Sequence, residues 1–434
     1  MPIMFVGGKK VYRSMRSLDK EIAKMDAPEK VVISLKQHLG APAKCVVALG
    51  EYVLRGQLIG EMTGDYVANA NVHSSISGVV TSIEADDDGV VCVTIENDGN
   101  MTEIDPMPYT RSLVDSSPEE LVEAIGHFGI VGMGGAGFPT HTKLKNTMGN
   151  VNKFLINCVE SEPFMTKDAA LLHKYPTEIL GGIKVMMKIM SIKKSDIFIG
   201  EQMLEVGYEF LDYLKDRNFI DVNLCTDKYP QGDERQLIAA VYKTEIPFDR
   251  LPPDTYSVVF NIETCYRVYD CLATGKPITD VLITVEGDGI VEPQNVIVPL
   301  GTSVADVIKY CGGLDENCKS VVVGGSMMGN AINPFNTYVT KTTGSITCFK
   351  TPARHDGVDC IRCGRCEDAC PMHIPVPLLN RIWEIDDVEE AKSNMAHICV
   401  GCGVCSYVCP SDIALKDRVE ELKEKIIMME AENE

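Results

Sequence analysis

The feature that most constrains this chain is a run of cysteines that occurs twice near its C-terminus. Each copy has the spacing C-x-x-C-x-x-C-x-x-x-C-P, at Cys360, Cys363, Cys366, Cys370 with Pro371 and at Cys399, Cys402, Cys405, Cys409 with Pro410. A structural zinc site is the alternative, but zinc sites usually pair two short C-x-x-C hooks across a longer gap and need no following proline. The spacing therefore favours two iron–sulfur clusters of the [4Fe-4S] type.

The same spacing resembles that of two-cluster bacterial ferredoxins, in which the fourth cysteine of each run ligates the other cluster. The resemblance implies crossed ligation. Cluster 1 would take Cys360, Cys363, Cys366 and Cys409, and cluster 2 would take Cys399, Cys402, Cys405 and Cys370. A chain with such a domain is expected to transfer single electrons.

Composition predicts an ordinary globular protein of about three domains, with 434 residues of which 45% are hydrophobic and 24% charged. No apolar run approaches the roughly 18 residues needed to cross a bilayer, and residues 1–10 do not resemble a signal peptide. Nine of the 17 cysteines lie scattered outside the two runs, as in a reducing compartment. We expect a cytoplasmic protein without direct membrane insertion, able to dock peripherally on the cytoplasmic face of a membrane complex.

A formal net charge of -21 argues against nucleic acid as a partner, because phosphates would be repelled rather than neutralised. Two interpretations of this charge stay open. It can serve solubility alone, or it can steer a basic redox partner toward the chain.

Residues 31–97 alternate apolar and polar side chains over short spans broken by glycine, which predicts β-structure. The segments LGEYVLRGQLIGEM and SSISGVVTSI resemble the two halves of a biotinyl/lipoyl-like barrel-sandwich hybrid. Carrier domains of that type present a lysine between the halves, whereas residues 61–80 contain none. We therefore expect residues 1–105 to form an N-terminal extension and a barrel with a structural or docking role.

After residue 105 the pattern changes to alternating helices and strands, with a helix cap at Ser116 or Ser117. Residues 106–275 are predicted to form an α/β domain, residues 276–350 a β-grasp domain, and residues 351–434 the cluster domain. The cluster domain ends in an amphipathic helix whose apolar positions are Leu415, Val419, Leu422, Ile426 and Met429. Packing on its own domain is the simpler interpretation of that helix, and contact with a partner is the alternative.

A glycine-rich loop, residues 129–143, follows the first helix of the α/β domain and ends at Lys143. Dense glycine lets backbone N–H groups approach a phosphate, and a lysine adds a charge, although glycine loops also make ordinary turns. The loop is not a P-loop, because Lys143 is followed by Leu144 rather than by serine or threonine.

Four ordered segments then resemble the flavin-bearing, NuoF-type subunit of respiratory complex I. They are GMGGAGFPTHTK, which resembles its flavin mononucleotide (FMN) loop, NCVESEP at residue 157, YPQGDERQL at residue 229 and NIET at residue 261. The order of domains resembles that of RnfC-like proteins. The implied fold is multidomain: a barrel-sandwich hybrid, a Rossmann-like flavin domain, an SLBB-type β-grasp and a two-cluster ferredoxin domain.

Carried over by position, the resemblance implies two sets of contacts. The FMN contacts would be Gly132, Gly134, Lys143, Asn157, Glu160, Ser161, Gly232, Asn261 and Thr264, and the NADH contacts Phe138, Glu162 and Glu234. No catalytic acid or base is expected. Three positions depart from the complex I pattern: Met133 replaces an arginine, Val159 an aspartate and Asp233 a glutamate.

The resemblance implies an NADH-oxidising, reversible electron-transfer subunit. A hydride from NADH would reduce FMN, and single electrons would pass through two [4Fe-4S] clusters to a protein partner. That partner would be a membrane Rnf subunit, a soluble reductase or ferredoxin. The alternatives are a PrdC-like carrier that feeds a dedicated substrate reductase, and a ferredoxin-like adaptor with a non-functional flavin site.

Overall fold

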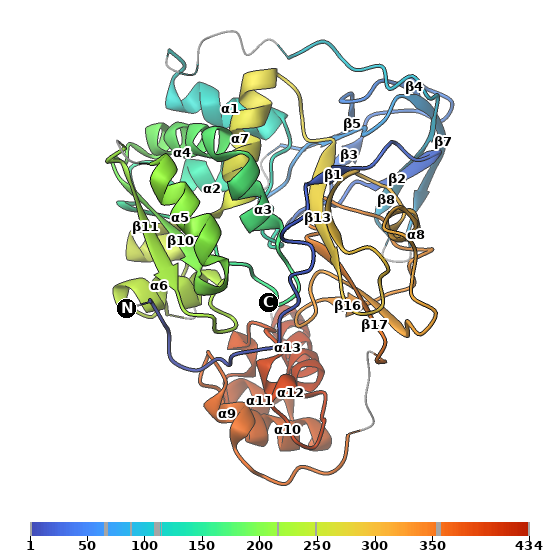
Figure 1. Ribbon diagram of the computed structural model, residues 1–434. Helices are drawn as coiled ribbons and strands as arrows, with labels where there is room; N and C mark the ends of the chain where they lie inside the picture. The colour runs from blue at the N-terminus through green and yellow to red at the C-terminus, as the bar shows by residue number, and fades with distance from the viewer. Residues whose placement is uncertain are drawn as a thin grey trace.

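The computed structural model describes residues 2–64, 68–86, 89–107, 113, 115–214, 217–247, 250–352 and 357–432. Within these residues the strands form four sheets, and the last part of the chain forms a helical domain below them (Figure 1). None of the described helices is both long and apolar enough to span a bilayer.

Residues 30–97 form two small antiparallel sheets, as the alternation predicts, with strand orders β2-β8-β7-β4 and β3-β5-β6. Val31, Ile33, Ile59 and Ile95 are fully buried in the barrel core. The strands are β2 (Lys30–Ser34), β3 (Lys44–Cys45), β4 (Tyr52–Val53), β5 (Leu58–Glu61), β6 (Val72–His73), β7 (Gly78–Ala85) and β8 (Val91–Asn97).

The α/β domain contains a parallel sheet of order β11-β10-β9-β12. Buried side chains place α1, α3, α4, α5 and α7 on one face and α6 on the other. Ser117 caps α1 in a capping box with Glu120, which confirms the predicted helix start. The elements are α1 (Pro118–His127), α2 (Thr140–Thr147), β9 (Lys153–Cys158), α3 (Lys167–Lys174), α4 (Pro176–Met190), β10 (Ser195–Gly200), α5 (Leu204–Tyr213), β11 (Ile220–Cys225), α6 (Glu234–Tyr242), β12 (Ser257–Asn261) and α7 (Ile262–Thr274).

The β-grasp domain contains a mixed sheet of order β1-β14-β13-β17-β15-β16. Its first strand, β1 (Ala23–Lys24), comes from the N-terminal extension and pairs in parallel with β14. Two residues with no strong alternation carried no sequence signal for this pairing. The other elements are β13 (Asp280–Glu286), β14 (Gln294–Pro299), α8 (Val304–Tyr310), β15 (Ser320–Val323), β16 (Asn330–Ala331) and β17 (Ser345–Phe349).

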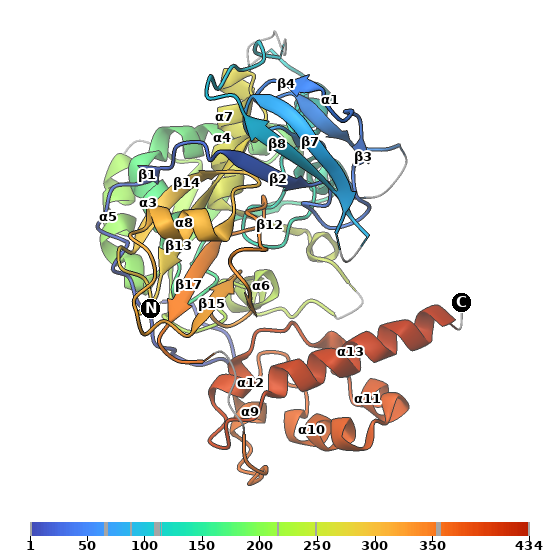
Figure 2. The ribbon, with the colours of Figure 1, turned by 90° about the vertical axis from the view of Figure 1, so that its right-hand side faces the viewer.

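The cluster domain is helical, and its long last helix α13 (Leu415–Glu432) lies along α10 and α11 (Figure 2). Leu415, Val419, Leu422 and Ile426 are buried in the core of this domain. Packing of the amphipathic helix on its own domain is thereby confirmed. The shorter helices are α9 (Arg365–Asp368), α10 (Val376–Ile385), α11 (Val388–Ser393) and α12 (Val404–Tyr407).

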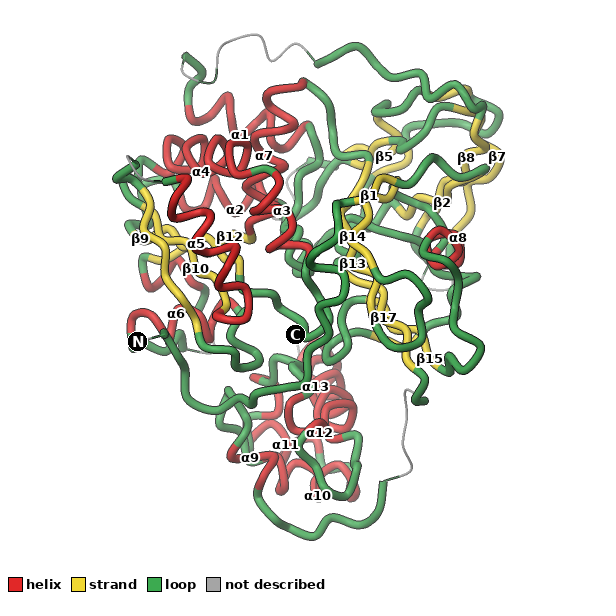
Figure 3. Tube along the Cα trace, in the orientation of Figure 1, coloured by secondary structure: helices red, strands yellow, loops and turns green. Residues whose placement is uncertain are grey.

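Residues 2–22, here called the N-terminal strap, run as a loop along the boundary between the α/β domain and the cluster domain before reaching β1 (Figures 1 and 3). The backbone of Lys9 exchanges hydrogen bonds with Tyr229, and the N–H of Gly8 donates to the carbonyl of Ala369 at 2.8 Å. Further along, the hydroxyl of Ser14 donates to Glu286 in the β-grasp domain. The strap thus joins three domains.

Candidate functional site

The glycine loop closes on itself at one end of the α/β domain. The N–H of Gly132 donates to the carbonyl of Phe138 at 2.8 Å, and Gly137 donates back to Gly132 at 3.1 Å. Gly135 and Gly137 have φ of 100° and 65°, a conformation that favours glycine. The backbone from Gly134 to Ala136 is exposed, so the loop presents bare peptide groups on its open side.

Two asparagines hold the neighbouring strand ends. Asn157 and Asn261 are paired in register at the carboxyl ends of β9 and β12. The amide of Asn157 donates to the carbonyl of Gly232 at 2.8 Å, which brings the segment after β11 over the sheet edge. A Cβ on Gly232 would lie 2.6 Å from the carbonyl of Val159, so only glycine allows this approach. The arrangement matches the rule that open α/β sheets bind ligands at their carboxyl edge.

Lys143, on α2, points into the same region. Its ammonium contacts Glu234 Oε2 at 2.8 Å and donates to the carbonyl of Val259 at 2.7 Å. The structure therefore pairs a residue predicted to contact FMN with one predicted to contact NADH. Phe138 and Ser161, two further predicted contacts, are both half-buried.

A buried ionic network beneath the loop was not predicted from the sequence. Lys167 and Glu263 form an ion pair at 2.6 Å with both side chains 1% exposed, and Lys167 also donates to the carbonyl of Met133. Asp168 accepts a 2.6 Å hydrogen bond from Asn261. The only sequence signal was the pair of charges in the otherwise apolar segment that begins α3.

Glu160 and Asp168 both belong to this network and are almost completely buried. Oε1 of Glu160 accepts hydrogen bonds from the N–H groups of Asp168 and Ala169, whereas Oε2 has no partner. Burial, and then the charge of Asp168, raise the pKa of Glu160 to about 8. Burial raises the pKa of Asp168 as well, and its Oδ1 also lacks a partner.

These observations fit a flavin. Buried oxygens without partners are rare in proteins and are commonly explained by a bound group. Here they lie in a network that contains Asn261 and supports a loop of exposed N–H groups next to a lysine. That Glu160, Asn157, Asn261 and Lys143 hold FMN stays a prediction.

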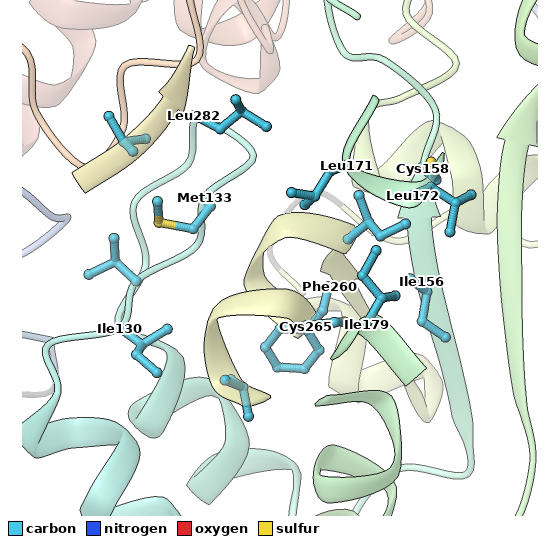
Figure 4. Packing of buried hydrophobic residues seen from close by; sticks show 14 of the residues in the cluster. Ile130, Met133, Ile156, Cys158, Leu171, Leu172, Ile179, Phe260, Cys265 and Leu282 are labelled. Carbon is cyan, nitrogen blue, oxygen red and sulfur yellow. The ribbon is translucent and has the colours of Figure 1, made fainter. Parts of the chain in front are cut away.

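The three departures from the complex I pattern have structural explanations. Met133 is fully buried in the core (Figure 4), and its backbone N–H donates to Thr264 Oγ1 at 3.1 Å. Val159 lies in the core on the opposite face of the sheet. Asp233 caps α6 by accepting hydrogen bonds from Arg235 and Gln236. Met133 and Val159 thus add apolar contacts, and Asp233 fixes a helix start.

Glu162 is engaged by groups from other parts of the chain. It is 2% exposed, and its carboxylate accepts hydrogen bonds from the N–H groups of Met327 and Met328 at 2.8 and 3.1 Å. Tyr229 Oη lies 3.4 Å from Glu162 Oε1 and donates to the carbonyl of Cys402 at 2.7 Å. Glu162, predicted to contact the nucleotide, therefore lies where the α/β, β-grasp and cluster domains meet.

The eight cysteines of the two runs line two separate small cavities. The outer cavity is lined by Cys360, Cys363, Cys366 and Cys409, and the inner cavity by Cys370, Cys399, Cys402 and Cys405. Each cavity offers four thiols, the number that a [4Fe-4S] cluster requires, so the residues fit two such clusters. Within the described residues no cysteine, histidine or carboxylate group meets the geometry of a single-ion metal site.

Burial keeps these thiols protonated at neutral pH, so binding of iron is coupled to proton release. It raises the pKa of Cys366 to about 11 and that of Cys402 to about 12. Because iron ligands are thiolates, binding of iron at neutral pH must displace the protons of these thiols.

The N-terminal barrel supports the back of the glycine loop. Residues 69–78, where a carrier domain would display its lysine, are all buried. The fully buried Lys341 of the β-grasp domain donates to the carbonyls of Asn71 and Gly129, both at 2.7 Å. Leu39 N–H donates to Gly137 at 3.0 Å. These contacts support a structural role for the barrel.

Comparison with protein families assigns each of these regions. The matches are the RnfC barrel sandwich hybrid domain at residues 3–100, the Nuo51 FMN-binding domain at 125–270, the SLBB domain at 282–331 and a 4Fe-4S dicluster domain at 359–414. Over 382 residues the chain is 34% identical to a subunit of the proton-translocating ferredoxin:NAD(+) oxidoreductase complex of Clostridium ljungdahlii, covering 86% of this chain and 83% of that protein. The chain belongs to the RnfC family.

A second RnfC-family relative is a subunit of the Na(+)-translocating ferredoxin:NAD(+) oxidoreductase complex of Acetobacterium woodii, 33% identical over 84% of this chain and 83% of its own length. Among solved structures, an NAD+-reducing [NiFe]-hydrogenase shares 19% identity with a TM-score of 0.47, over 66% of this chain and 52% of the hydrogenase chain. The four family matches confirm the predicted fold class. The chain is an oxidoreductase subunit with FMN and [4Fe-4S] clusters as cofactors.

Proposed function

We propose that this RnfC-family chain exchanges electrons between NADH and a protein partner through FMN and two clusters, in either direction. When bound, FMN supplies the conversion between a hydride and single electrons, and the clusters carry the electrons one at a time. NADH loses two electrons and one proton to become NAD+, so each turnover requires two single-electron exits. Assembly with the other subunits of an ion-translocating ferredoxin:NAD oxidoreductase, on its cytoplasmic face, is part of the proposal.

The observation that carries this proposal is the position of the inner cavity. The backbone carbonyl of its ligand candidate Cys402 accepts a hydrogen bond from Tyr229, which is three residues before Gly232 at the edge of the flavin pocket. In the outer cavity, by contrast, Cys360 and Cys363 are exposed. The proposed order is therefore pocket, inner cluster, outer cluster and partner.

The protein groups contribute binding and electrostatics. The exposed N–H groups of the glycine loop and the ammonium of Lys143 would hold the flavin phosphate. Glu160 would form a hydrogen bond with the flavin through its unpaired oxygen, and Phe138 offers an aromatic face for the nicotinamide nucleotide.

The test is an anaerobic preparation of the whole chain in which iron and flavin are counted and visible spectra are recorded before and after NADH. We expect flavin and cluster absorbance to bleach together. A brown protein with iron but no releasable flavin would leave only the adaptor, and thiols that hold zinc would exclude the proposal. Recovery of membrane Rnf subunits in a pull-down would separate this assembly from a PrdC-like carrier, which would recover a soluble reductase.

A further inference from the structure

Tyr229 occupies the contact between the flavin side of the molecule and the inner cavity. The side chain is 1% exposed and lies in a small core with Val11, Ala369, Cys402 and Val404. A phenol carries one proton. Since Cys402 O is 2.7 Å from Tyr229 Oη and Glu162 Oε1 is 3.4 Å away, the hydroxyl donates to the carbonyl of Cys402.

Glu162 binds the third domain at this junction, the β-grasp domain, through a turn that contains Met327 and Met328, here called the methionine turn. Its two oxygens accept the N–H groups of Met327 and Met328 from the loop after β15. A Cβ on Gly325 would lie 2.1 Å from Cγ of Glu162, and a Cβ on Gly403 would lie 2.6 Å from the carbonyl of Met327. The methionine turn is thus packed between Glu162 and the residue that follows Cys402.

The N-terminal strap holds the other side. Lys9 brackets Tyr229 with two backbone hydrogen bonds of 2.9 Å, and Gly8 bonds the carbonyl of Ala369, the residue before Cys370. A Cβ on Gly7 would lie 2.7 Å from the carbonyl of Cys370. Two residues that line the inner cavity, Cys370 and Cys402, are therefore fixed by groups outside the cluster domain.

We propose that Tyr229 is a positioning residue for the inner cluster, with Glu162 fixing the methionine turn beside it instead of binding the nucleotide. This inference rests on the proposed function, because it gives the Tyr229 hydroxyl the role of holding the inner cluster in position relative to the flavin site. The path from Gly232 to Cys402 then follows covalent bonds and crosses a single hydrogen bond.

The test compares Tyr229→Phe with wild type, and Tyr242→Phe is the matched control at the end of α6. Whole chains are purified anaerobically, iron and flavin are counted, and the dithionite-reduced proteins are examined by electron paramagnetic resonance (EPR). Tyr229→Phe should keep its flavin and alter the signal of one cluster only. NADH-driven bleaching of the clusters should slow about tenfold, which corresponds to the loss of one hydrogen bond of about 1.4 kcal/mol.

Loss of about half of the iron in Tyr229→Phe would also support the assignment, because one cluster would then depend on the hydroxyl. An unchanged EPR spectrum with an unchanged bleaching rate would overturn it, as would equal loss of both clusters. Glu162→Gln should alter the same EPR signal and leave KM for NADH unchanged. A raised KM with a wild-type spectrum would instead make Glu162 a nucleotide ligand.

These outcomes are separable from failure of the proposed function. Dithionite reduces the clusters without NADH or flavin, so the EPR comparison tests Tyr229 even if NADH bleaches nothing. If NADH does not reduce the wild-type chain, the proposed function is wrong. The role of the Tyr229 hydroxyl is then still decided by the EPR comparison of Tyr229→Phe with wild type.

Discussion

The outer and inner cavities are built from the same parts and differ in their surroundings. Each is lined by four cysteines. Cys360 and Cys363 of the outer cavity are exposed, whereas Cys370 and Cys402 of the inner cavity are each 7% exposed and covered by other domains. The comparison shows how two copies of one motif come to have different surroundings: the cysteine spacing stays the same, and the neighbouring domains decide which cavity is covered.

Removing one ligand from each cavity gives the largest expected effect. Cys402→Ser and Cys363→Ser should each lose about half of the iron. In Cys402→Ser, NADH should still bleach the flavin and no longer reach the remaining cluster, whereas Cys363→Ser should keep NADH-driven bleaching of its inner cluster. Iron counts and stopped-flow absorbance measure this, and equal behaviour of the two variants would break the proposed order.

The buried Glu162, beside the inner cavity, should make the stability of the protein depend on pH. Burial raises the pKa of Glu162 from an ordinary 4.5 to about 7, so the folded state binds this proton more tightly than the unfolded chain. Its contribution is complete below 4.5 and is lost as pH rises through about 7, a change on the order of 3 kcal/mol.

Glu162→Gln should therefore lose less stability than wild type between about pH 5 and pH 8, measured by calorimetry of the iron-loaded protein. The exposed Glu119→Gln is the control and should follow wild type. A wild-type protein that gains stability relative to Glu162→Gln over this range would contradict the assigned burial.

Lys143→Ala should show that the flavin site binds its cofactor independently of the two cysteine-lined cavities. Loss of the ammonium should weaken FMN binding about tenfold, because a charge-assisted hydrogen bond is removed, while iron content stays constant. Lys145→Ala, on the exposed side of the same helix, is the matched control. Flavin and iron that fall together would show that the glycine loop is not a local site.

The smallest intramolecular effect is expected at the exposed rim of the outer cavity. Ile361 is 66% exposed, so Ile361→Asp should change stability by less than about 0.5 kcal/mol and leave NADH-driven bleaching unchanged. Only electron transfer to a partner protein should slow, measured with ferredoxin as the acceptor. Ile385 is 68% exposed in the same domain, so Ile385→Asp is the control. Equal slowing in both variants would show that electrons do not leave through the rim of the outer cavity.

Local patterns predicted most of the fold. Alternation located the barrel strands, a capping box located α1, and the spacing of Leu415, Val419 and Leu422 located α13. The four cysteines that line the outer cavity are those that the ferredoxin resemblance grouped, and their role as ligands stays a prediction. Such features are readable because each depends on residues close in sequence or on a fixed spacing.

The remainder of the site depends on contacts between distant segments. Glu162 meets Met327 across a domain boundary, and Lys167 meets Glu263 across the α/β domain. A single buried charge looks the same in sequence as an exposed one, and only the packing of domains decides its partner. The resemblance could therefore name Glu162 as a site residue without indicating what it contacts.

The strap has a consequence for how the molecule is made. Gly8 is synthesised long before Ala369, yet its N–H donates to the carbonyl of Ala369. Contacts so far apart in sequence form late in folding. The strap can therefore dock only after the cluster domain has been synthesised, and it stays undocked while the domains between them are made.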